Sequence, residues 1–98
     1  MTLTGKQNRY LRALGHHLKP SLQLGKAGLS DEFIGKIKEL LERHELIKVK
    51  LLQSCPLNLV AASEGVSAAL HCDVAQQIGK TMLLYQARAE DPKITLPL

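Results

Sequence analysis

A Gly-x-x-Gly segment, Gly25-Lys26-Ala27-Gly28, stands between a predicted strand and a predicted helix. Residues 21–24 before it alternate polar and apolar side chains, and Ser30 after it is a good N-cap for a helix. Because glycine tolerates positive φ and has no side chain, the segment predicts a tight connection from strand to helix. Successive N–H groups in such a turn form a concave anion-binding nest, and Lys26 adds a cation. The segment therefore predicts a strand–loop–helix unit whose loop binds a phosphate.

The periodicity of the 98 residues predicts a single α/β domain in the order αβαβαββ. Thr4 and Gln7 have the spacing of a capping box at the first helix. Gly79-Lys80 reads as a two-residue hairpin turn, so the four-stranded sheet is expected to be mixed, and residues 88–98 are expected to form an extended tail. The expected helices are residues 5–17, 31–44 and 57–71, and the expected strands are residues 21–24, 46–52, 74–78 and 81–87.

Two apolar patterns predict where the core lies. In the first helix, Tyr10, Leu11, Leu14 and Leu18 fall on one apolar stripe, and the basic residues lie largely off it. The last strand, residues 81–87, is apolar on both of its faces. Because successive side chains of a strand point to opposite faces, this strand is expected to be covered on both sides.

Positive charge is concentrated near the N-terminus. Residues 1–30 hold five basic residues and no acidic residue, whereas the whole chain has a net charge of +4. A basic stripe beside a glycine loop is typical of a nucleic-acid binder. Lys48 and Lys50 share one face of a predicted strand, where they either join the binding surface or protect a sheet edge against aggregation. The candidate RNA-binding residues are Gly25, Lys26, Ala27 and Gly28 of the loop, together with Lys6, Arg9, Arg12, Lys19, Lys48 and Lys50.

Two details of the loop sharpen this hypothesis. Asp31 and Glu32 begin the following helix and repel a phosphate placed directly on the helix end, so the loop amides and Lys26 are the expected contacts. Gly28 is expected to have a positive φ, because the chain turns sharply there from the loop into the helix. A side chain at Gly28 is also expected to stand between the loop amides and a phosphate.

Four segments of the chain together resemble the chloroplast-RNA-splicing and ribosome-maturation (CRM) domain, in its bacterial stand-alone, YhbY-like form. Their order and spacing match that family over residues 3–96, and the combination is more specific than any one of them. Two departures are Gln86, where members often have an arginine, and residues 54–72, which match poorly. The four segments are Leu18–Pro20, Leu24–Leu29, His44–Lys50 and Ile78–Tyr85.

The resemblance implies a fold and a function. The implied fold is a four-stranded mixed sheet with helices, similar to the C-terminal domain of translation initiation factor 3. The implied function is RNA binding through the loop Gly25–Gly28 and the neighbouring basic surface. For bacterial members it further implies association with ribosomal RNA in precursors of the large ribosomal subunit, and hence a role in ribosome biogenesis.

Other classes of function are weighed against this one. A small protein–protein interaction module that uses the same loop remains an alternative. The chain shows no nucleophile–base pair, no paired carboxylates in a plausible cleft and no four-ligand metal set, so it is expected to be non-enzymatic, without cofactor, metal or small-molecule substrate. No apolar stretch approaches the ~20 residues of a membrane span, and the N-terminus lacks a signal-peptide core, so the expected location is the cytoplasm.

Overall fold

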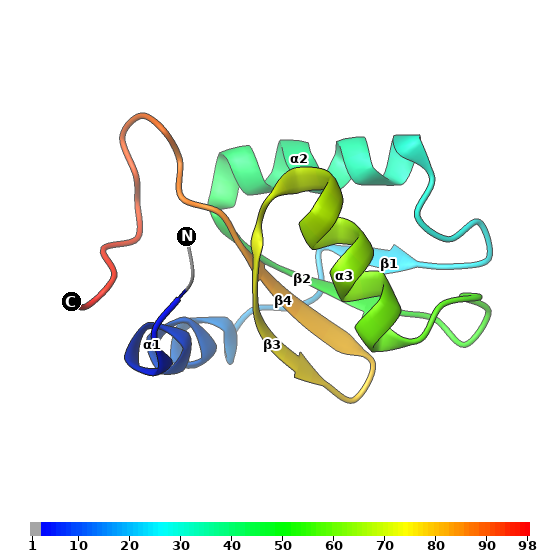
Figure 1. The fold of residues 1–98 in the computed structure, drawn as a ribbon, viewed down its shortest axis with the longest axis horizontal. Helices are drawn as coiled ribbons and strands as arrows, with labels where there is room; N and C mark the ends of the chain where they lie inside the picture. Colours follow the sequence, from blue (N-terminus) through cyan, green and yellow to red (C-terminus); the bar gives the residue numbers. More distant parts are fainter. Residues whose placement is uncertain (1–2) are drawn as a thin grey trace.

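Three helices and four strands follow one another in the order αβαβαββ in the computed structural model, which describes residues 3–98 (Figure 1). The helices are α1 (Gly5–Gly15), α2 (Asp31–His44) and α3 (Leu59–Leu70), and the strands are β1 (Leu22–Leu24), β2 (Leu46–Leu51), β3 (Asp73–Ile78) and β4 (Thr81–Tyr85). The order across the sheet is β1-β2-β4-β3. Since β1 runs parallel to β2 and β4 runs antiparallel to both of its neighbours, the predicted mixed sheet is confirmed.

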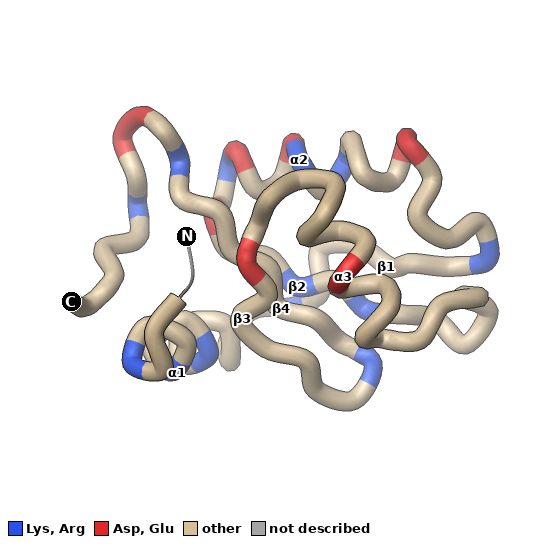
Figure 2. The backbone as a smooth tube through the Cα atoms, in the orientation of Figure 1, with Lys and Arg blue, Asp and Glu red and all other residues tan. Residues whose placement is uncertain are grey.

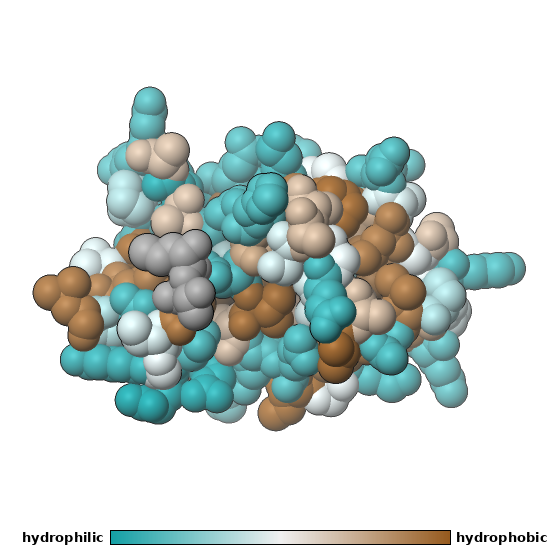
Figure 3. Space-filling view, in the orientation of Figure 1, coloured by the Kyte–Doolittle hydropathy of each residue, from teal (hydrophilic) through white to brown (hydrophobic). Residues whose placement is uncertain are grey.

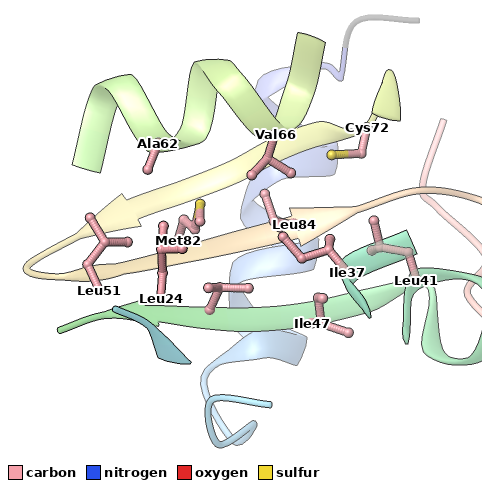
Figure 4. Close-up of a cluster of buried hydrophobic side chains, with 11 residues drawn as sticks. Leu24, Ile37, Leu41, Ile47, Leu51, Ala62, Val66, Cys72, Met82 and Leu84 are labelled. Atoms are coloured by element: carbon pink, nitrogen blue, oxygen red, sulfur yellow. The ribbon is translucent and has the colours of Figure 1, made fainter. Parts of the chain in front are cut away.

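The strand β4 is covered on both faces, as its apolar sequence predicts. Met82 and Leu84 point into the cluster beneath α2 and α3, which Figure 4 shows. Leu83 and Tyr85 point the opposite way, into a smaller cluster that includes Leu11 of α1. The sheet therefore lies between two layers of helices, with α1 alone on its second face.

The helix α1 rests on the sheet through a narrow contact. A Cβ added to Gly15 would lie 2.8 Å from the Leu83 methyl groups, so the backbone of α1 approaches the sheet closely there. Leu11, one turn earlier, is the fully buried member of the apolar stripe. The other three are partly exposed: Tyr10 and Leu14 of α1 are 40% and 39% exposed, and Leu18, which follows the end of α1, is 38% exposed.

Side-chain caps decide where the helices begin. Thr4 and Gln7 form the predicted capping box, with hydrogen bonds of 3.0 and 3.1 Å. The Ser30 hydroxyl accepts a hydrogen bond from the Phe33 N–H at 3.1 Å, which confirms the predicted start of α2. In α3 the cap is Asn58, whose side chain accepts from the Ala61 N–H at 2.8 Å. The helix therefore starts at Leu59, two residues later than predicted.

A buried carboxylate joins the end of α2 to the C-terminal tail. Glu45 is fully buried and has a φ of 63°, which turns the chain from α2 into β2. Its carboxylate accepts hydrogen bonds from the N–H groups of Arg88 at 2.8 Å, Lys93 at 2.6 Å and Ile94 at 2.8 Å. Its backbone carbonyl accepts another from the Gln86 N–H at 2.9 Å.

These contacts fix the tail against the α1 side of the sheet. Ile94 and Leu96 pack on the cluster around Leu11, and the Gln7 side chain donates to the Pro97 carbonyl at 3.0 Å. Residues 88–98 contain neither helix nor strand. The tail is nevertheless a packed part of the domain, because a buried charge and two apolar side chains anchor it.

Burial alone raises the pKa of Glu45, but the hydrogen bonds from Arg88, Ile94 and Lys93 outweigh it and leave the pKa below its ordinary value. The charged form therefore stabilises the fold. This contribution is complete above the unfolded-state pKa of about 4.3 and is lost as the pH falls through the lower folded-state value.

We expect Glu45→Gln to lower the free energy of unfolding at pH 7 by about 2 kcal/mol or more, because hydrogen bonds to a charged group contribute about 1.5–3 kcal/mol each. The difference from the unmodified protein should shrink as the pH falls below about 4. Urea unfolding at several pH values measures both effects. Glu42→Gln, at an exposed position of α2, is the matched control. Equal stability losses in the two variants would contradict the assigned role of Glu45.

Candidate nucleic-acid interface

The loop between β1 and α2 is a hydrogen-bonded turn with two exposed residues at its tip. The Gly28 N–H donates to the Gly25 carbonyl at 3.0 Å, which places Lys26 and Ala27 at the central positions of a β-turn. Both central residues are exposed. Within residues 3–98, no hydrogen bond occupies their own N–H groups. These two amides and the Lys26 ammonium group are therefore the donors that the loop can present to an anion.

The two glycines of the loop face the protein rather than the solvent. Gly28 has the predicted positive φ, at +66°. A Cβ added there would lie 3.5 Å from Cγ of Pro56, and one added to Gly25 would lie 3.5 Å from Cδ1 of Leu52. The expectation that a side chain at Gly28 would block a phosphate is therefore wrong, because the side-chain direction at this position points inward. Gly28 is needed for its conformation.

The basic residues of α1 and β2 lie on the same face of the sheet. Lys48 and Lys50 alternate with the core residues of β2 and follow Leu46, which packs in the cluster around Leu11 of α1. The edge-protection alternative for these two lysines is wrong, since β2 lies inside the sheet between β1 and β4. Lys48 is half-buried, and the exposed basic side chains on this side are Lys6, Arg9 and Arg12 of α1, Lys19 before β1, and Lys50.

Beyond α1 this face of the sheet is open. Lys50 pairs with Gln23 on one side and with Thr81 on the other, and Ile78 pairs with Thr81 at the last position of β3. Ile78 is 62% exposed, which a helix packed over this end would not permit. The open area therefore combines a basic, two polar and one apolar side chain next to the basic surface of α1.

Lys80 belongs to the same end of the sheet, although the sequence indicated only a turn residue. Its carbonyl accepts a hydrogen bond from the Leu51 N–H at 2.7 Å, and Leu51 pairs with Leu24, the residue before the glycine loop. The β3–β4 turn and the loop Gly25–Gly28 thus flank the same end of β2. In the sequence, an exposed lysine in a two-residue turn does not indicate a binding residue. Only the strand order shows that this turn lies at the same end of the sheet as the glycine loop.

No acidic residue lies on α1, β1, β2 or β4. Figure 2 shows basic segments on α1, along β2 and in the loops at the right-hand end, whereas α2 carries both acidic and basic segments. In the space-filling view, hydrophilic side chains lie along the lower edge of the molecule (Figure 3). Among the described residues the one ion pair, Glu39–Arg43 at 3.5 Å, lies on α2, so the basic side chains on the α1 side have no acidic partner. The remaining acidic residues, apart from the four on α2, are the buried Glu45, Glu64 on α3, Asp73 at the start of β3, and Glu90 and Asp91 in the tail.

Within residues 3–98, no three His, Cys, Asp or Glu side chains come close enough together to hold a metal ion. No helix in that range has the length and apolar character needed to cross a membrane.

Residues 3–86 match the family model of the CRS1 / YhbY (CRM) domain. The chain belongs to this family. It is 43% identical over 95 residues to the probable RNA-binding protein YqeI of Bacillus subtilis, covering 97% of this chain and 99% of that protein. It is 34% identical over 96 residues to an RNA-binding protein of Haemophilus influenzae, covering 98% and 96%.

A solved structure supports the same assignment. The hypothetical protein SAV1595 of Staphylococcus aureus, described as a candidate RNA-binding protein, superimposes on this CRM domain with a TM-score of 0.81. The two chains are 40% identical, and the match covers 98% of this chain and 100% of the other. The predicted family and the predicted fold class are thereby confirmed.

The backbone conformations of Gly28 in the loop and Gly35 in α2 predict opposite effects of alanine on the free energy of unfolding. Gly28→Ala should lower the free energy of unfolding by about 1–2 kcal/mol, because a Cβ is strained at positive φ although space exists for it. Gly35→Ala, at an open position inside α2, should raise it by about 0.5–1 kcal/mol. Thermal or urea unfolding of both variants measures the difference. A neutral Gly28→Ala would remove the conformational requirement at this position.

Proposed function

We propose that this CRM domain is a non-enzymatic protein that binds ribosomal RNA in precursors of the large ribosomal subunit, in the cytoplasm, during ribosome assembly. The observation that carries the proposal is the basic surface formed by α1, β2 and the loop Gly25–Gly28, three segments that hold no acidic residue. Such a surface attracts a polyanion over its whole extent. Family membership and the relatives named as RNA-binding proteins support the choice of RNA.

The proposed contacts are mainly to the RNA backbone. The amides of Lys26 and Ala27, with the Lys26 side chain, bind one phosphate. The basic residues of α1 and β2 bind phosphates further along the strand. The aromatic side chains argue against a stacking sheet, because Tyr85 is buried and Phe33 is half-buried in the core. Recognition therefore depends on shape and phosphate spacing. The ribosomal target follows from the family resemblance.

Crosslinking the protein to RNA in cells and mapping the bound sites tests the target. Enrichment of large-subunit ribosomal RNA is the expected result. The ribosomal assignment would be overturned if other RNAs were enriched and ribosomal RNA were recovered only at the level of an uncrosslinked control. A domain that binds a protein through the same loop would yield no RNA in this experiment, and its partner affinity would depend only weakly on salt.

Lys26→Ala should weaken binding to RNAs of unrelated sequence and reduce the slope of log K against log salt by about one phosphate contact. The reason is that Lys26 stands at the tip of the turn and contacts the backbone rather than a base. Fluorescence anisotropy at a series of salt concentrations measures both quantities. Lys36→Ala, at an exposed position of α2, is the control and should change neither. An unchanged slope for Lys26→Ala would remove this residue from the interface.

The double variant Arg9→Glu with Arg12→Glu should reduce RNA affinity strongly while the melting temperature stays close to that of the unmodified protein. Both side chains are exposed on α1, and neither forms an ion pair with a described residue. The matched control is Lys36→Glu with Lys38→Glu, which makes the same change of charge on α2. If both double variants lose affinity equally, net charge rather than the α1 surface determines binding.

A further inference from the structure

A small cavity opens at the end of the domain where three loops meet. It lies between the segment after β2, the start of α3 and the β3–β4 turn, and its volume is about 200 Å³. Figure 1 shows these segments gathered at the right-hand end, near the loop that leads into α2. The phosphate contacts proposed above make no use of this cavity. Its walls include Leu51, Leu52, Cys55, Leu57, Gly79 and Lys80.

The cavity and the glycine loop share a wall. Leu52 lines the cavity, and its N–H donates to the Leu24 carbonyl at 2.9 Å, directly before the loop. The side-chain directions of Gly25 and Gly28 point at Leu52 and Pro56, at 3.5 Å in both cases. The glycine loop and the cavity are therefore adjacent at this end of the domain.

The chemistry of the cavity suits one flat, partly polar group. Four of its nine lining residues are leucines, and Gln53, Asn58 and Lys80 line it as exposed polar residues. Asn58 uses its side-chain oxygen as the cap of α3, which leaves its amide NH₂ to donate to a ligand. Pockets for drug-sized ligands measure about 300–1,000 Å³, so this cavity is too small for a peptide helix but large enough for a single ring system.

Charge identifies the kind of ligand. No acidic residue occurs in residues 46–63 or 74–89, which supply all the walls, and Lys26, Lys50 and Lys80 stand at this end of the sheet. A neutral ring attached to a negatively charged backbone matches that arrangement. A base that is paired inside a duplex is not available to such a cavity, whereas a bulged or single-stranded base is.

We propose that this cavity holds one unpaired nucleobase of the bound RNA, with the flanking phosphates at Lys26 and Lys80. The proposal rests on RNA binding by the glycine loop. It adds a preference that backbone contacts alone do not produce. The domain should bind an RNA hairpin with a single-nucleotide bulge more tightly than the same hairpin without the bulge, by about tenfold, which is the scale of one base contact.

The thiol of Cys55, in the cavity wall, can report whether the cavity is occupied. Cys55 is half-buried in the wall, whereas Cys72 is 3% exposed and burial raises the pKa of its thiol to about 11. Iodoacetamide should therefore modify Cys55 much faster than Cys72 in the folded protein, which peptide mass spectrometry measures. At saturating RNA, the bulged hairpin should slow modification of Cys55, and the fully paired hairpin should not. Equal modification rates with the two RNAs would overturn the proposal.

Blocking the cavity supplies the second test. Alkylation of Cys55 with N-ethylmaleimide should remove the preference for the bulged hairpin and leave the affinity for the paired hairpin unchanged. Cys55→Ser treated in the same way is the control and should retain the preference. Should alkylation unfold the domain, the protection experiment on the unmodified protein decides alone. A protein that binds both hairpins equally lacks the base site but keeps the proposed function, whereas one that binds neither lacks both.

Discussion

The carboxylate of Glu45 joins the end of α2 to the C-terminal tail, two segments far apart in the sequence. A fully buried charge is costly unless hydrogen bonds compensate it, and here three backbone N–H groups of the tail do so. The tail in turn brings Ile94 and Leu96 onto the small cluster beneath α1. The tail thus adds to the packing of α1, which carries much of the basic surface and also rests on the sheet through Leu11.

The inward direction of the two loop glycines has a functional consequence. A loop that packs on the segment around Leu52 and Pro56 is held in one conformation before any ligand arrives. Binding then requires little ordering of the backbone, which is a main cost of association for flexible loops. Asp31 and Glu32 begin α2 immediately behind this loop, and their negative charges disfavour an anion at the helix end.

Features that depend on neighbouring residues were predictable from the sequence. The capping box of Thr4 and Gln7, the Ser30 cap and the positive φ at Gly28 each follow from contacts within a few residues. The start of α3 was predicted two residues too early. Asn58 is the N-cap, but an asparagine can be recognised as a cap only when the path of the preceding turn is known. Helical periodicity marks the apolar stripe of α1, but it does not reveal that Leu11 is the one member of the stripe that is fully buried beside the Gly15–Leu83 contact.

By itself, the amino-acid sequence determined the element order, the family and the loop with its lysine, because local patterns and motif spacing encode all three. Only the tertiary structure decided which distant residues meet. Glu45 binds amides that follow it by 43 to 49 residues, and the Lys80 turn lies at the end of β2 because β4 is the neighbour of β2 in the sheet. Periodicity identifies which face of a strand is buried but not which strand is its neighbour. That choice depends on how all the apolar faces are buried together, which is a property of the whole chain.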